Sequence, residues 1–130
     1  MASIFTRIIN GEIPAYKVAE TDKYYAFLDI SPLQKGHTLV VPKKETDYLF
    51  DLEDEELAGL MVFAGKVAKA IEKSVPCARI GVAVVGLEVP HAHIHLVPLQ
   101  DGSELNFSRP KLTLSGDELK ACAAAIAGRM

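Results

Sequence analysis

The stretch His-Ala-His-Ile-His-Leu-Val at residues 91–97 constrains the fold of this chain more than any other. In a β-strand, successive side chains point to opposite faces, so His91, His93 and His95 would share one face and the apolar residues between them would share the other. Three of the chain's four histidines lie here. The stretch therefore predicts a strand that carries a polar site in front and packs against a hydrophobic core behind.

The remaining patterns predict an α+β domain. Runs of alternating or β-branched residues predict further strands at 15–20, 24–28, 37–41 and 79–85. Apolar spacings of three and four predict a helical turn at 4–9 and a long helix at about 53–74, and a Ser115-x-x-Glu118 capping box begins a last helix that runs to 127. We expect one domain over residues 1–130, with a five-stranded, mostly antiparallel sheet.

The long helix is apolar on two sides. One stripe consists of Leu57, Leu60, Met61, Ala64, Ala68 and Ile71, and a second consists of Phe63, Val67 and Ala70. The sheet can cover one stripe. A second copy of the chain or the chain's own C-terminal segment would have to cover the other.

Composition excludes several classes of protein. Hydrophobic residues make up 49% of the chain and charged residues 24%, with a net charge of −3, so there is no broad basic surface for nucleic acid or an anionic membrane. The two cysteines, Cys77 and Cys122, form no C-x-x-C motif. No apolar run reaches the roughly 20 residues that span a bilayer, and the N-terminus has no hydrophobic signal core. We expect a cytoplasmic protein that binds any phosphate at a local site.

The three histidines allow three interpretations. They could bind a metal, since neutral imidazole suits zinc, copper or nickel, but no carboxylate or cysteine lies within the motif. They could be structural, each bonded to the backbone or a neighbour. They could also act on phosphorus, one as nucleophile and the others orienting it or holding the phosphoryl charge, because imidazole with its pKa of about 6.5 is partly neutral near pH 7. The third interpretation accounts best for three rings on one face.

Several motifs together resemble the histidine-triad (HIT) family of nucleotide hydrolases and transferases, in its Hint-like, purine-nucleoside phosphoramidase branch. The first is His-x-His-x-His followed by two apolar residues. The others are Ile4-Phe5 with the run from Ile8 to Ala15, Ala26-Phe27-Leu28-Asp29-Ile30-Ser31-Pro32, and Gly36-His37-Thr38-Leu39-Val40-Val41-Pro42-Lys43. The resemblance covers residues 4 to about 98. It implies a HIT-like fold, a purine nucleotide of the AMP type as substrate, no cofactor or metal, and a homodimer.

The resemblance also implies roles for individual residues. His93, in the middle of the triad, would be the nucleophile and form a covalent nucleotidyl-histidine at the α-phosphate. His95 would bond the phosphate or the leaving atom, His37 would complete the cluster from the next strand, and His91 would orient the others. Asp29 would accept hydrogen bonds from the ribose hydroxyls.

The resemblance places a further group of residues around the nucleotide. The walls of the base site would be Phe5, Ile8, Phe27, Ile30 and Leu39, and the phosphate side would include Gly86 and Glu88. Each apolar member could equally be a core residue.

The chain departs from the family pattern near the phosphate. Val85-Gly86-Leu87 stands where the family commonly has Ala-Gly-Gln, so the glutamine amide is absent, and Glu88 stands where the phosphoramidase branch has a serine. The family's phosphate-side asparagine has no counterpart in 79–85, and Glu45 stands where another histidine is common. A carboxylate at Glu88 would repel long polyphosphate tails and favour compact or cationic leaving groups.

These residues predict a homodimeric hydrolase that releases a nucleoside 5′-monophosphate from a small amine, acyl or phosphoryl group. Because the glutamine and serine are replaced, a nucleotide-binding or scaffold protein with incidental hydrolysis is the alternative. A zinc-binding protein is a third hypothesis, which metal content would test.

Overall fold

The computed structural model describes residues 2–130, so Met1 lies outside the described residues. A five-stranded sheet has the order β1-β2-β3-β5-β4, and every neighbouring pair is antiparallel. The strands are β1 (Lys17–Glu20), β2 (Tyr24–Leu28), β3 (Thr38–Pro42), β4 (Arg79–Ala83) and β5 (Ile94–Leu99). The helices are α1 (Ile4–Ile9), α2 (Asp54–Ser74) and α3 (Gly116–Ala127), with a short 3-10 helix at Leu49–Asp51. The predicted α+β class is confirmed.

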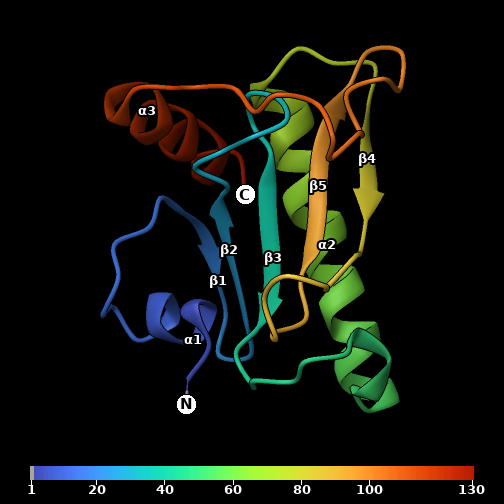
Figure 1. Ribbon diagram of the computed structural model, residues 1–130. Coiled ribbons are helices and arrows are strands. Elements are labelled where there is room, and N and C mark those ends of the chain that lie inside the picture. The colour runs from blue at the N-terminus through green and yellow to red at the C-terminus, as the bar shows by residue number, and fades with distance from the viewer. Residues whose placement is uncertain (1) are drawn as a thin grey trace.

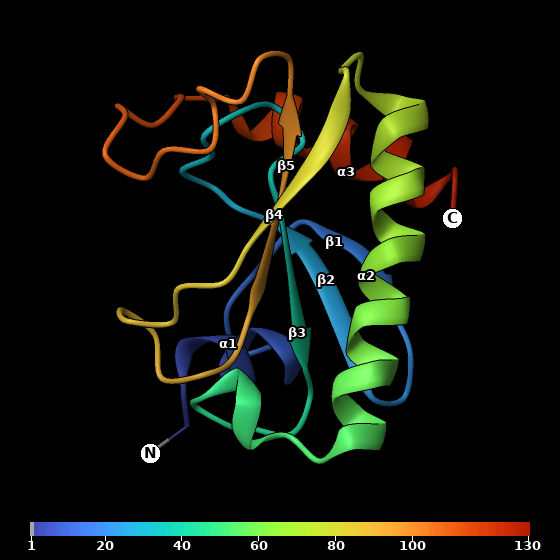
Figure 2. The same cartoon turned by 90° about the vertical axis from the view of Figure 1, so that its right-hand side faces the viewer.

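The sheet separates two hydrophobic clusters. Seen edge-on in Figure 2, α2 lies on one side of the sheet, whereas α1 and the loop that joins β4 to β5 lie on the other. Alternation along the strands supplies both clusters: in β2, Ala26 and Leu28 face α2, while Tyr25 and Phe27 face α1. The predicted alternation around the histidines holds in the same way, because Ile94 packs in the α2 cluster with its neighbours Ala92 and Leu96.

The second stripe of α2 is covered by the chain itself. Phe63 stacks on Tyr24 with ring centroids 5.7 Å apart, and it shares a core with Leu119 and Ile126 of α3. Figure 1 shows α3 lying near β1, at the opposite edge of the sheet from β4. Of the two coverings that the sequence allowed for this stripe, the C-terminal segment is the one found. Within residues 2–130, no helix combines the length and the apolar character needed to cross a bilayer.

The predicted strand at 91–97 is wrong at its start. The ladder with β3 begins at Ile94, which pairs with Val40, so His91 and His93 precede the strand. The strand β3 ends at Pro42, two residues after Val40. Pro42 has no N–H, and its carbonyl accepts a hydrogen bond from the His91 ring (Nε2 to O, 2.7 Å). The backbone groups that would continue the ladder are therefore absent or occupied. Other boundaries shift by up to two residues: β1 starts at Lys17, β3 at Thr38, and β4 ends at Ala83.

Candidate active site

A cavity of about 440 Å³ lies on the face of the sheet that carries the histidines. Most of its lining comes from three parts of the chain: the ends of β2 and β3, the loop 85–89, and the segment 104–111 that follows β5. The lining residues are Phe5, Asp29, Ser31, His37, Leu39, Val85, Gly86, Leu87, Glu88, Val89, His93, His95, Phe107 and Lys111. Several of the residues that the sequence predicted for the site thus line one cavity.

His37 and His95 form a hydrogen-bonded pair whose proton positions follow from their partners. The backbone N–H of Leu33 donates to Nδ1 of His37 (3.0 Å), so that nitrogen carries no proton and the neutral ring is protonated on Nε2. The Nε2–H of His37 then donates to Nδ1 of His95 at 3.0 Å. By the same rule His95 carries its proton on Nε2. That nitrogen is therefore available to donate to a ligand.

Gly36 sets the position of His37. It has φ +94°, which disfavours a side chain, and a Cβ there would lie 3.0 Å from Cγ2 of Val75 and 3.2 Å from Cγ of Pro98. The glycine lets the chain pass close to the core and then enter β3 directly after His37. A side chain at position 36 would be strained by this φ and would crowd Val75 and Pro98.

Burial keeps the pair uncharged. Desolvation, together with smaller effects of charge repulsion from the neighbouring His37 and His93 rings, lowers the pKa of His95 to about 3. Burial also lowers the pKa of His37, although the Asp29 carboxylate, with Oδ2 3.7 Å from Nε2, opposes this. Near pH 7, His95 therefore acts as a neutral N–H donor.

The His93 ring is fixed so that one nitrogen is left as a lone pair. Its Nδ1–H donates to the carbonyl of His91 at 2.8 Å, because a carbonyl can only accept. The ring packs edge-on against Phe5 and His95, with centroids 5.0 and 4.9 Å away. Within residues 2–130 no protein group hydrogen-bonds to Nε2 of His93, and the ring lines the cavity. In a neutral ring, Nε2 is the basic and nucleophilic atom.

His91 does not reach the cavity and is completely buried. Its Nε2–H donates to the carbonyl of Pro42, and its Nδ1 accepts from the hydroxyl of Ser3 at 2.7 Å. Its own carbonyl holds His93. This geometry agrees with the orienting role that the resemblance implies.

Glu45 extends this network to the surface. Its Oε1 accepts from the Ser3 backbone N–H at 2.6 Å and from the Thr6 hydroxyl at 2.7 Å, and these two bonds hold the pKa of Glu45 at about 2. The hydroxyl of Ser3 in turn caps α1 by accepting from the Thr6 N–H. The carboxylate thus fixes the start of α1 against His91.

Most of the predicted site residues come together. Those that line the cavity are Phe5, Asp29, His37, Leu39, Gly86, Glu88, His93 and His95. Three residues predicted to wall the base do not line it. Ile8 and Phe27 are core residues in the α1 cluster behind Phe5, and Ile30 points outward with 67% of its surface exposed.

The sequence-based prediction missed several lining residues. Ser31 follows Asp29 and donates its N–H to the Asp29 carboxylate at 2.8 Å, and Val85, Leu87 and Val89 belong to the loop whose other members were predicted. Phe107 and Lys111 come from the stretch 100–113, which has no regular pattern. Their only local signal is an aromatic and a basic residue within a polar segment.

Asp29, His37 and His95 could also hold a metal ion. Each offers one ligand atom, and the three atoms lie within 4.8 Å of one another. Two imidazoles and a carboxylate suit zinc. A metal ion bound through Nε2 of His37 and Nδ1 of His95 would replace the hydrogen bond that now joins these two atoms.

The comparison with known proteins agrees with this geometry. The family model described as the HIT domain matches residues 10–102. The chain is 34% identical over 132 residues to adenosine 5′-monophosphoramidase hnt1 of Schizosaccharomyces pombe, an alignment that covers 100% of this chain and 99% of that protein. It is 41% identical over 101 residues to adenosine 5′-monophosphoramidase HNT1 of Saccharomyces cerevisiae, which covers 77% of this chain and 64% of that one.

Solved structures match over nearly the whole chain. A Hit-like protein involved in cell-cycle regulation from Bartonella henselae has a TM-score of 0.87 at 34% identity, covering 98% of this chain and 96% of that one. A Zn-bound histidine triad family protein from Mycobacterium smegmatis has a TM-score of 0.82 at 30% identity, covering 98% and 95%. The family match, these relatives and the arrangement of the four histidines lead to one conclusion: the chain belongs to the HIT family, in its Hint-like branch.

Proposed function

We propose that this protein hydrolyses a nucleoside 5′-monophosphate of the AMP type from a small leaving group, with His93 as the nucleophile. The observation that carries the proposal is the hydrogen bond from Nδ1–H of His93 to the His91 carbonyl, which leaves Nε2 as a lone pair at the cavity. Membership of the HIT family and the two phosphoramidase relatives support a nucleotide hydrolase.

The reaction takes place in two displacements. Nε2 of His93 attacks the α-phosphorus, an N–P bond forms, and the bond to the leaving group breaks. Water then attacks the nucleotidyl-histidine and releases the 5′-monophosphate, so one water is consumed in each cycle. Nε2–H of His95 donates to a phosphoryl oxygen or to the leaving atom, and it is preorganised for this by His37.

The cavity favours particular substrates. Asp29, Phe5 and Leu39 line the cavity. We expect Asp29 to accept hydrogen bonds from the ribose hydroxyls, and Phe5 and Leu39 to provide apolar surface for the base. Glu88 adds a carboxylate to the phosphate side, which disfavours anionic polyphosphate leaving groups. We therefore expect an amine to be the preferred leaving group.

Mass spectrometry and kinetics test the role of His93. Brief incubation with adenosine 5′-phosphoramidate followed by an acid quench should leave an AMP adduct on the 91–97 peptide of the wild-type chain. His93→Ala and His93→Gly should form no adduct and lose turnover by at least about 10³-fold. Lys120→Gln, on the exposed side of α3, is the matched control and should retain full activity.

Two outcomes would contradict the proposal. Full turnover by either His93 variant would remove the assigned nucleophile. Tight binding of AMP by the wild-type chain without hydrolysis of any adenylated amine would favour the nucleotide-binding or scaffold alternative.

We also propose that the protein is a homodimer of single-domain chains. β4 is an edge strand, and Val82 on it is 52% exposed, while Met61 and Val62 on α2 are exposed too. An unpaired edge beside exposed apolar side chains suits pairing with a second copy. A cytoplasmic location and the lack of nucleic-acid partners stay predictions.

A further inference from the structure

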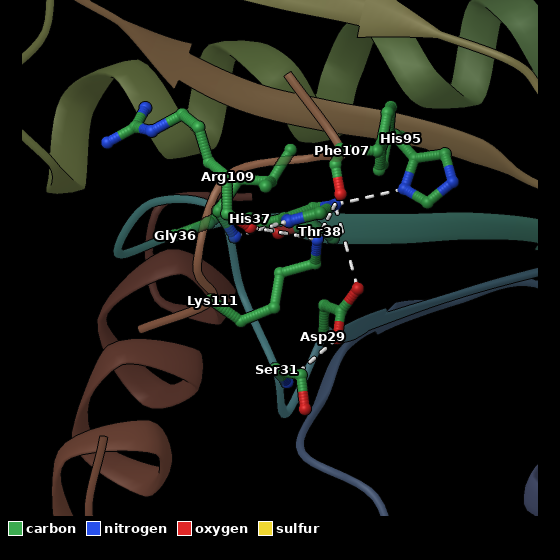
Figure 3. Close-up of polar contacts among 10 residues, drawn as sticks. Asp29, Ser31, Gly36, His37, Thr38, His95, Phe107, Arg109 and Lys111 are labelled. Atoms are coloured by element: carbon green, nitrogen blue, oxygen red, sulfur yellow. Dashed lines mark hydrogen bonds and ion pairs between the residues drawn. The ribbon is translucent and has the colours of Figure 1, made fainter. Parts of the chain in front are cut away.

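The segment that follows β5 returns over the cavity. Residues 104–111 lie beyond the part of the chain that matches the HIT domain, which ends at residue 102. Phe107 packs edge-on against His95, with ring centroids 4.7 Å apart, and lies 6.5 Å from the His37 ring. Figure 3 shows the Lys111 side chain reaching from this segment toward His37 and Asp29. The segment therefore adds its own groups to the catalytic histidines.

The ammonium of Lys111 is held in place by the backbone. It donates to the carbonyl of Phe107 at 2.6 Å and more weakly to that of Arg109 at 3.4 Å, and it lies 5.9 Å from the centroid of the Phe107 ring. An ammonium has three N–H groups, so one is left for a ligand. No carboxylate among residues 2–130 lies within 4.0 Å of this ammonium.

Lys111 is the positive charge that offsets the negative charges around the cavity. Asp29 and Glu88 contribute two carboxylates to the lining, and the buried His37–His95 pair is neutral near pH 7. A phosphoryl group in this cavity would face two negative charges and neutral donors. The Leu87 side chain offers no hydrogen-bond donor, and Lys111 is the only lysine or arginine in the lining formed by the described residues.

We infer that Lys111 binds the anionic phosphoryl group of the nucleotide and thereby makes the site selective for nucleotide over nucleoside. The inference rests on the proposed function, because it takes the ligand to be a nucleoside 5′-monophosphate. The preorganised ammonium supplies a charge-assisted hydrogen bond to a phosphoryl oxygen. Lys111 thus takes the place of the glutamine amide that the family commonly has in the loop corresponding to 85–89, and it comes from the C-terminal side of β5.

Calorimetry with a matched pair of ligands tests the inference. AMP and adenosine share the base and the ribose and differ in the phosphate. At pH 8, Lys111→Gln should bind AMP about tenfold more weakly than the wild-type chain, while its affinity for adenosine should change less than about twofold. Lys111→Arg should recover part of the AMP affinity because it restores the charge. Lys120→Gln on α3 is the control and should bind both ligands as the wild type does.

Salt provides a second measurement. Raising the ionic strength should weaken AMP binding to the wild-type chain more than to Lys111→Gln, because the variant lacks the charge that salt screens. Thermal melting of each variant confirms that the fold is retained.

The outcomes separate this inference from the proposed function. If AMP binding is equally tight in Lys111→Gln and the wild type, or if AMP and adenosine both weaken by the same factor, the inference is wrong, while hydrolysis by His93 can still be measured in the wild-type chain. If the wild-type chain neither binds AMP nor cleaves adenosine 5′-phosphoramidate, the proposed function is wrong.

Discussion

The four imidazole rings have similar chemistry, but their hydrogen-bond partners leave different ring atoms free. His93 donates to a carbonyl and keeps a lone pair, whereas His95 accepts from His37 and keeps an N–H. His91 has both nitrogens bonded to protein groups and is left without a free one. The proposed nucleophile, donor and orienting residue thus differ in their hydrogen-bond partners and not in residue type.

Burial of these rings should make the fold sensitive to acid. His95 has a pKa of about 3 in the folded chain, against about 6.5 when unfolded, so the unfolded chain binds more protons between these values. The contribution of His95 to the free energy of unfolding is therefore fully present above about pH 6.5 and is lost progressively as the pH falls toward 3. From His95 alone we expect a loss of about 2 kcal/mol between pH 7.5 and pH 5.

Urea titrations at the two pH values measure this loss. In His95→Asn, which has no titrating ring, the difference between pH 7.5 and pH 5 should be smaller than in the wild type. His37 and His91, whose pKa values are lowered as well, should account for part of the remainder. An identical difference in the wild type and the variant would show that folding does not lower the pKa of His95.

At the scale of elements, the C-terminal helix completes the core. Its first turn is closed by a capping box in which the Ser115 hydroxyl accepts from the Glu118 N–H and the Glu118 side chain accepts from the Ser115 N–H. Leu119, Cys122 and Ile126 then pack in the same core as the second stripe of α2. Stability of α3 is therefore coupled to the position of α2.

Ser115→Ala should lower the free energy of unfolding by about 1 kcal/mol, because it removes the oxygen that satisfies a free backbone N–H of the first turn. Urea unfolding followed by circular dichroism checks this. Ser108→Ala, in the exposed segment after β5, is the matched control, since its hydroxyl makes no hydrogen bond within residues 2–130. A loss of equal size in both variants would mean that the cap contributes nothing specific.

At the scale of the whole molecule, the edge strand β4 and the helix α2 both carry exposed apolar side chains. Val82 of β4 and Met61 and Val62 of α2 are exposed, whereas the opposite edge of the sheet lies near α3 (Figure 1). The two faces of the sheet are already covered by the chain. An interface between two copies is therefore expected at β4 and the adjoining side of α2.

Val82→Asp should shift the chain from dimer to monomer, because an unpaired carboxylate in a closed apolar interface is costly. Size-exclusion chromatography with light scattering at several concentrations measures the mass. Ala121→Asp, on the exposed side of α3, adds the same charge far from β4 and should leave the mass unchanged. A monomeric wild-type chain would contradict the proposed dimer.

The features that depended on local periodicity could be read from the chain alone. Alternation of imidazole and apolar residues was enough to predict which side chains at 91–97 share a face, since the period of two is a property of the extended backbone. The capping box, the two-sided helix and the five strands follow from similar short-range patterns. The histidine roles came from the resemblance of several motifs to one family, and the hydrogen bonds around His93 and His95 agree with them.

Long-range contacts decided the rest. The ladder starts at Ile94 because the ring of His91 takes the carbonyl of Pro42, 49 positions earlier, and no pattern near either residue shows this. Phe107 and Lys111 reach the cavity because an irregular segment folds back across β5. A segment without a repeat has no preferred face, so its side chains acquire a direction only from the surfaces against which they pack.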